Sequence, residues 1–129
     1  VISEEHNDYF MENFNGLAPD IKCDVFLASF LHELGHHETI CLIEDADELY
    51  CRDIKYEISQ ELEKKHSEAE IKALYQRYFD LPDEYEATMW AIEYIRENSE
   101  KIATLWGKLQ KAIIKFDEIN RIEVDAVGC

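Results

Sequence analysis

The chain has 129 residues, and its 13 lysines and arginines against 29 aspartates and glutamates give a formal charge of −16 at pH 7. Such acidity disfavours binding to nucleic acid or to anionic lipid, because both present negative phosphates. Hydrophobic residues make up 47% of the sequence, with only four glycines and two prolines, which indicates one folded domain and excludes a disordered chain.

No apolar run approaches the roughly 20 residues of a membrane-spanning helix, and the N-terminus lacks the pattern of a secretory signal. The four cysteines show no C-x-x-C spacing, and a chain with this much core material needs no disulfides. We therefore expect a soluble, cytoplasmic protein with free thiols. The chain begins with Val1 rather than Met, so elements upstream of this sequence can be missing.

Two helices are expected in the first part of the chain. The first is a short helix around Glu4 to Phe14, which ends before a turn at Asn15-Gly16. The second runs from Val25 to His36 and can be capped by Asp24. Apolar residues occupy both of its sides, which predicts a helix that is buried all round.

Residues 44–80 are expected to form an acidic helical insertion. Ile54 and Ile58 recur at helical spacing, and Ser67 with Glu70 fits a capping box at the start of a second helix. An insertion of this length can fold back beside a cleft and act as a lid or a partner-recognition surface.

Two more helices and a strand are expected after the insertion. Pro82 suits the first turn of one helix, and Ser99 can cap the other. Residues 121–127 alternate polar and apolar side chains, which predicts a short strand. The last helix also carries a basic strip whose role the sequence leaves open, formed by Lys101, Lys108, Lys111 and Lys115.

Residues 32–36 read His-Glu-Leu-Gly-His, the H-E-x-x-H pattern, inside an expected helix. Four residues of helix turn about 400°, which places His32 and His36 on one face where they can share a Zn²⁺ ion. Glu33 is turned about 100° away, so it can reach a water molecule on the metal and take its proton. Only roughly 0.03 such matches are expected by chance from this composition. The motif therefore predicts a zinc site with Glu33 as general base.

Glu84 is the expected third ligand, because a catalytic zinc ion usually has three protein ligands and one open position. On a helical wheel Glu84 falls on the apolar stripe of Ala91 and Ile95, where a carboxylate needs a cation. Glu86 is turned away toward Glu93 and the solvent.

Both motifs are similar to those of the ImmA/IrrE family of gluzincin-type metallopeptidases. The family has HELGH followed by E-x-E-A-N/D-x-F-A, and this chain has HELGH at 32–36 and E-x-E-A-x-x-W-A at 84–91. The match covers these 13 positions, and Thr88 stands where the family commonly has Asn or Asp. Members are often encoded by phages or mobile elements and cleave helix-turn-helix repressors or related regulators.

The resemblance implies that His32, His36 and Glu84 bind Zn²⁺ and that Glu33 is the general base of a peptidase. It also implies a mostly helical α+β, zincin-like single domain over residues 1–129, with a very small sheet. The charge and the resemblance together favour a basic regulatory protein as substrate. Neither nucleic acid nor a membrane is expected as a direct partner. The sequence leaves open the substrate's identity, the oligomeric state and which of four side chains stabilises the oxyanion, namely His37, His6, Tyr85 or Tyr94.

Two other interpretations remain. Glu33-x-x-His36 and Glu63-x-x-His66 are two copies of the E-x-x-H motif of di-iron carboxylate bundles, although the neighbours of the second copy are polar. A small acidic protein also suits a non-catalytic role, as a nucleic-acid mimic or an inhibitor on a metal-binding helical fold. A chelator separates the peptidase from the non-catalytic mimic, because the peptidase loses its function without the metal and the mimic does not need the motif.

Overall fold

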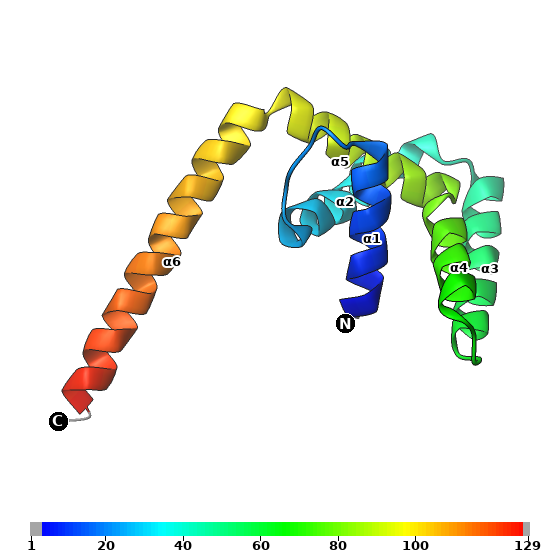
Figure 1. Ribbon diagram of the computed structural model, residues 1–129. Coiled ribbons are helices and arrows are strands. Elements are labelled where there is room, and N and C mark those ends of the chain that lie inside the picture. Colours follow the sequence, from blue (N-terminus) through cyan, green and yellow to red (C-terminus); the bar gives the residue numbers. More distant parts are fainter. Residues whose placement is uncertain (1–3, 128–129) are drawn as a thin grey trace. The chain divides into compact units, whose positions relative to one another are not determined.

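A computed structural model describes the backbone of residues 4–127 and the side chains of residues 5–120. Its elements, in chain order, are α1 (Glu4–Leu17), α2 (Val25–Thr39), a 3₁₀ turn η1 (Ile40–Leu42), α3 (Asp45–Leu62), α4 (Glu68–Phe79), α5 (Pro82–Glu97) and α6 (Ser99–Val127) (Figure 1). The chain divides into two compact units, one ending at Tyr94 and one beginning at Ile95.

The predicted α+β, zincin-like fold with a small sheet is wrong, because residues 4–127 form helices and no strand. The strand predicted at 121–127 is the end of α6. An alternating sequence becomes a strand only where a second strand pairs with its backbone. The described part of the chain has no such partner, so the helix that begins at Ser99 continues, with each added residue closing one more hydrogen bond.

Three of the sequence signals at helix starts are confirmed, but Ser99 is the first residue of α6 and not its cap, because the residue that precedes the helix is Asn98. The Asp24 carboxylate caps α2 and accepts a hydrogen bond from the backbone nitrogen of Leu27 at 2.8 Å. Ser67 and Glu70 form a reciprocal capping box at the start of α4, and Pro82 is the first residue of α5. Such caps stabilise a helix by about 1 kcal/mol each, and they depend only on neighbouring residues.

Helix α2 is buried on one side only, which corrects the prediction that it is buried all round. Phe26 is 66% exposed and Phe30 is 58% exposed, whereas Ala28, His32 and Gly35 are buried. The buried side therefore consists largely of small residues together with the first histidine of the motif.

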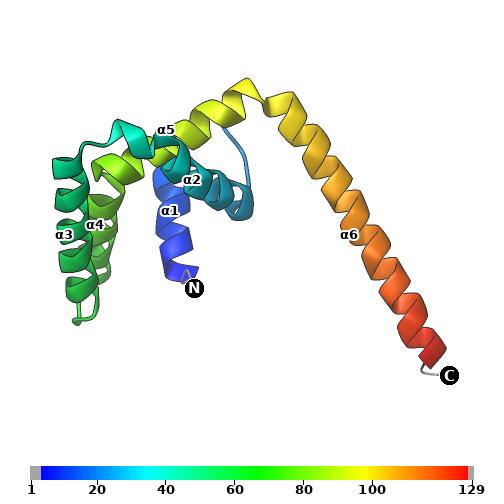
Figure 2. The ribbon, with the colours of Figure 1, turned by 180° about the vertical axis from the view of Figure 1, so that it is seen from behind.

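Helices α3 and α4 lie side by side in both views of the ribbon (Figures 1 and 2). Cys51, Ile54 and Ile58 of α3 are buried with Leu81, and Tyr78 of α4 packs against them. The 44–80 segment thus shares a hydrophobic cluster with the residue that precedes α5.

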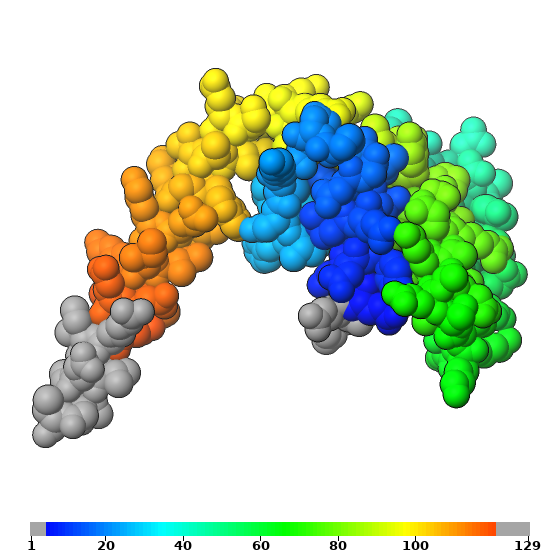
Figure 3. Space-filling view, viewed as in Figure 1, coloured from blue at the N-terminus to red at the C-terminus, as the bar shows by residue number. Residues whose placement is uncertain are grey.

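Helix α4 also packs against α1, as the blue and green surfaces of Figure 3 show. The rings of Tyr9 and Tyr75 stack with their centres 4.7 Å apart, and Phe10 and Phe79 continue the aromatic contact. The N-terminal helix and the 44–80 segment therefore support each other within the first unit.

Helix α6 has 29 residues, more than the roughly 20 that span a bilayer. Charged side chains recur along it, including Lys101, Lys108 and Lys115. In the described part of the chain, no helix combines the length and the apolar character that crossing a membrane requires.

The backbones of α2 and α5 approach closely at Gly35. A Cβ atom built on Gly35 would lie 2.4 Å from the backbone oxygen of Ala87, far inside van der Waals contact. Ala87, Ala91 and Ala28 are fully buried. Small side chains on both helices are therefore what allows this contact.

Replacing Gly35 with alanine should lower the free energy of unfolding by about 1–3 kcal/mol, because the methyl group collides with a backbone atom that cannot turn aside. Gly16→Ala is the matched control, since a Cβ there meets nothing within 4 Å in a helix. Denaturant unfolding of both variants measures the difference. Equal stability of the two variants would contradict the close contact.

Candidate metal centre

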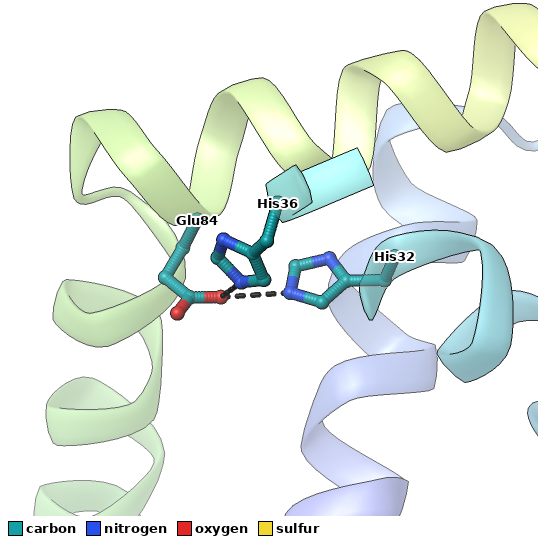
Figure 4. A group of neighbouring side chains, drawn as sticks. All are labelled: His32, His36 and Glu84. Carbon is teal, nitrogen blue, oxygen red and sulfur yellow. Dashed lines mark hydrogen bonds and ion pairs between the residues drawn. The ribbon is translucent and has the colours of Figure 1, made fainter. Parts of the chain in front are cut away.

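Helices α2 and α5 bring His32, His36 and Glu84 together (Figure 4). Glu84 Oε2 lies 2.8 Å from Nε2 of His32 and 3.1 Å from Nε2 of His36. One ligating atom from each residue lies within 4.8 Å of the others. His32 and Glu84 are buried, and His36 is half-buried.

The donor set and its spacing fit a zinc ion. Two imidazole nitrogens and one carboxylate oxygen are common zinc ligands, with bonds of about 2.0–2.2 Å. Donors around a tetrahedral ion with such bonds lie about 3.4 Å apart. The distances from Glu84 Oε2 to His32 Nε2 and His36 Nε2, 2.8 and 3.1 Å, would therefore have to increase by only a few tenths of an ångström. We refer to His32, His36 and Glu84 as the triad.

Thr88 orients the imidazole of His32. Its hydroxyl oxygen lies 2.9 Å from Nδ1 of His32, and the residue is only 1% exposed. With a metal ion bound, Nδ1 would carry the proton and donate it to Thr88, and Nε2 would present its lone pair to the ion. The hydroxyl of Thr88 can therefore hold the His32 ring through Nδ1, although the similar family commonly has Asn or Asp at this position.

Lys55 of α3 binds the other oxygen of Glu84, a contact that the sequence analysis missed. Its ammonium donates to Glu84 Oε1 at 2.7 Å and to Asp83 Oδ2 at 2.6 Å. The sequence did contain an indication of this contact, because Lys55 lies on the same apolar stripe of α3 as Ile54 and Ile58. A cation on such a stripe needs an anion, as Glu84 needs a cation on its own stripe.

Opposing effects set the charges of the triad. Burial raises the pKa of Glu84, but hydrogen bonds from His32, His36 and Lys55 lower it by a larger amount. The pKa of Glu84 is therefore below its ordinary value. The hydrogen bond to Glu84 raises the pKa of His36 and outweighs burial, which lowers it. Glu84 is therefore a buried, ionised carboxylate, which is the state that binds a cation.

A small cavity of about 30 Å³ lies beside the triad, enough for a water molecule. Glu33, which is exposed to solvent, lines this cavity together with His32 and Glu84. Burial and the Glu84 charge raise the pKa of Tyr78, so this phenol stays protonated at the wall of the cavity. The remaining lining residues are His6, Asn7, Phe10, Ser29 and Phe79.

The four candidate oxyanion stabilisers are placed differently. His6 of α1 lines the cavity, and burial lowers its pKa. The His37 side chain is 83% exposed and lies 3.7 Å from Glu38. Tyr85 and Tyr94 are exposed. Of the four, His6 is the one that the structure places beside the triad.

The second E-x-x-H motif lies at the turn between α3 and α4. Glu63 is the C-cap residue that follows α3, and His66 contacts the Glu70 carboxylate at 3.1 Å and the Glu61 backbone oxygen at 2.6 Å. Neither Glu63 nor His66 belongs to the triad. The hydrogen bond with Glu70 is the main cause of a raised pKa at His66.

Comparison of the chain with known protein families, with curated proteins and with solved structures gives no match. The candidate metal centre is therefore supported by the donors, distances and burial of His32, His36 and Glu84 alone.

Glu84→Ala should weaken zinc binding by orders of magnitude, because it removes the one negatively charged ligand of the triad. Glu86→Ala is the matched control, since Glu86 lies two residues away on the same helix and outside the triad. Titration against a competing chelator measures both affinities. Equal zinc affinity of wild type and Glu84→Ala, or loss of metal from the Glu86 variant, would rule out the site.

Thr88→Val keeps the shape of the side chain and removes its hydroxyl, so His32 loses the partner of Nδ1. Zinc affinity should fall by about 10–100-fold, the usual effect of losing such an orienting contact. Thr104→Val serves as control, because the Thr104 hydroxyl bonds only to the Glu100 backbone on an exposed helix surface. The same chelator titration applies, and an unchanged affinity in Thr88→Val would show that the contact does not orient the ligand.

Proposed function

We propose that this protein is a zinc-dependent hydrolase of peptide bonds, with Glu33 as general base. The observation that supports it most strongly is the shared cavity, where Glu33 lies beside His32 and Glu84. A base beside two of the three proposed zinc ligands, with room for water, is an arrangement that suits metal-assisted hydrolysis.

In this proposal His32, His36 and Glu84 would hold a zinc ion, which when bound would lower the pKa of water toward about 7 and polarise a carbonyl group. Glu33 accepts the proton of the attacking water and passes it to the leaving amine. Thr88 keeps the His32 ring in the required tautomer and orientation. Of the four candidates from the sequence, His6, at the cavity wall, is the one best placed to donate a hydrogen bond to the developing oxyanion.

The proposed substrate is a regulatory protein with a basic surface, such as a repressor. The similarity of the two motifs to those of repressor-cleaving peptidases supports the reaction, and the charge of −16 supports a basic partner through electrostatic steering. Residues 4–127 offer no sheet edge to which an extended peptide could add as a strand. The substrate must therefore be held by side chains of the helices.

A second candidate is a non-catalytic protein in which the metal ties α2 to α5. The cavity volume favours it, since about 30 Å³ accommodates a water molecule but no peptide group without a shift of neighbouring side chains. The number of ligands favours the hydrolase, because structural zinc sites almost always have four protein ligands and the triad has three.

Glu33→Gln should keep zinc at the wild-type ratio while peptide cleavage falls by at least about 10²-fold, because the amide cannot accept the proton. Glu38→Gln, on the exposed side of the same helix, should cleave as the wild type does. The measurements are elemental analysis of the purified protein and mass spectrometry of a diverse peptide mixture incubated with each variant.

Wild-type cleavage that survives in Glu33→Gln would exclude Glu33 as the base. Bound zinc with no cleavage of any peptide by the wild type, and a melting temperature that falls on chelation, would favour the non-catalytic candidate. A chain that binds no zinc would exclude both.

A further inference from the structure

The two carboxylate oxygens of Glu84 have separate partners. Oε2 lies between the imidazoles of His32 and His36, at 2.8 and 3.1 Å, and Oε1 accepts a hydrogen bond from Lys55 at 2.7 Å. The Glu84 side chain is only 4% exposed, so little solvent reaches either oxygen. One oxygen thus points at the metal position, and the other is occupied by a cation.

Three groups hold the ammonium of Lys55 in place. Besides Glu84, Asp83 accepts a hydrogen bond from it at 2.6 Å, and the ring centre of Tyr78 lies 5.4 Å away. Asp83 is itself anchored, because its Oδ1 accepts the backbone N–H of Glu84 at 2.8 Å. Burial lowers the pKa of Lys55, but the two carboxylates raise it by more, so the ammonium stays charged.

The charges of this cluster leave Glu84 able to bind a divalent ion. Lys55 and Asp83 have opposite charges and lie 2.6 Å apart, so they largely cancel. A lysine that faced Glu84 alone would neutralise the ligand itself. With Asp83 beside it, Lys55 occupies Oε1 while the negative charge of Glu84 remains uncompensated toward the histidines.

We propose that Lys55 is a positioning residue of the metal centre, which holds Glu84 Oε1 so that the carboxylate binds the metal through Oε2 alone. This inference rests on the metal site proposed above and is independent of whether the site is catalytic.

The consequence is an open coordination position. Carboxylates bind metals through one oxygen or through both, and a second oxygen from Glu84 would take the place that a catalytic zinc ion keeps for water. Lys55 removes that possibility by its own bond to Oε1. The 44–80 segment, expected from the sequence to be a lid or a partner-recognition surface, would then determine the geometry of the ligand.

Cobalt is the suitable probe, because Zn²⁺ has a filled d shell and shows no d–d bands. The intensity of the Co²⁺ visible bands is high in four-coordinate sites and falls when more ligands bind. Lys55→Met, loaded with Co²⁺, should therefore absorb several-fold more weakly than the loaded wild type. Lys55→Arg should recover most of the wild-type intensity, because a guanidinium donates to both carboxylates. Lys64→Met, at an exposed ion pair with Glu61 beyond α3, should match the wild type.

If Lys55→Met does not fold, the double variant Lys55→Met/Asp83→Asn is measured instead, because it removes one charge of each sign and should show the same loss of intensity. A wild-type spectrum in either variant, or an equal change in Lys64→Met, would overturn the role of Lys55 while leaving the metal site intact. A wild type that develops no Co²⁺ bands would overturn the metal site and this inference with it.

Discussion

The close contact between α2 and α5 at Gly35 is the constraint on which the candidate site depends. Gly35 lies between the two histidines of the motif, and Ala87 lies one helical turn after Glu84. If a zinc ion is bound between the helices, its bonds of about 2.0–2.2 Å would leave no room for larger side chains at this contact. A side chain at Gly35 would displace α5, and with it Glu84, the third member of the triad.

Charged and ionisable side chains of alternating sign surround the contact between α2 and α5. A buried carboxylate is unfavourable without partners, and Glu84 receives them from two histidines of α2 and from Lys55 of α3. Asp83 then compensates Lys55 at the surface of the cluster. The 44–80 segment is thereby connected to the site, because it supplies Lys55, the cation that contacts Glu84.

Residues that act through local spacing were predictable. His32 and His36 are four residues apart in a helix, so the backbone alone places them on one face. The carboxylate of Glu84 was found by its place on an apolar stripe, and the same argument applied to α3 would have found Lys55. The contact of Thr88 with His32 and the place of His6 at the cavity were not readable, because each joins side chains from two helices.

The sequence by itself determined the helix starts at Asp24, Ser67 and Pro82, since a cap involves only the residues next to it. It did not determine whether 121–127 would pair as a strand, because pairing needs a second segment distant in the chain. Tertiary structure likewise decided which face of α2 is buried and which oxygen of Glu84 is left for a metal. The buried face of α2 and the partners of Glu84 both depend on how closely separate helices pack. All the side chains between two helices together set the distance between them.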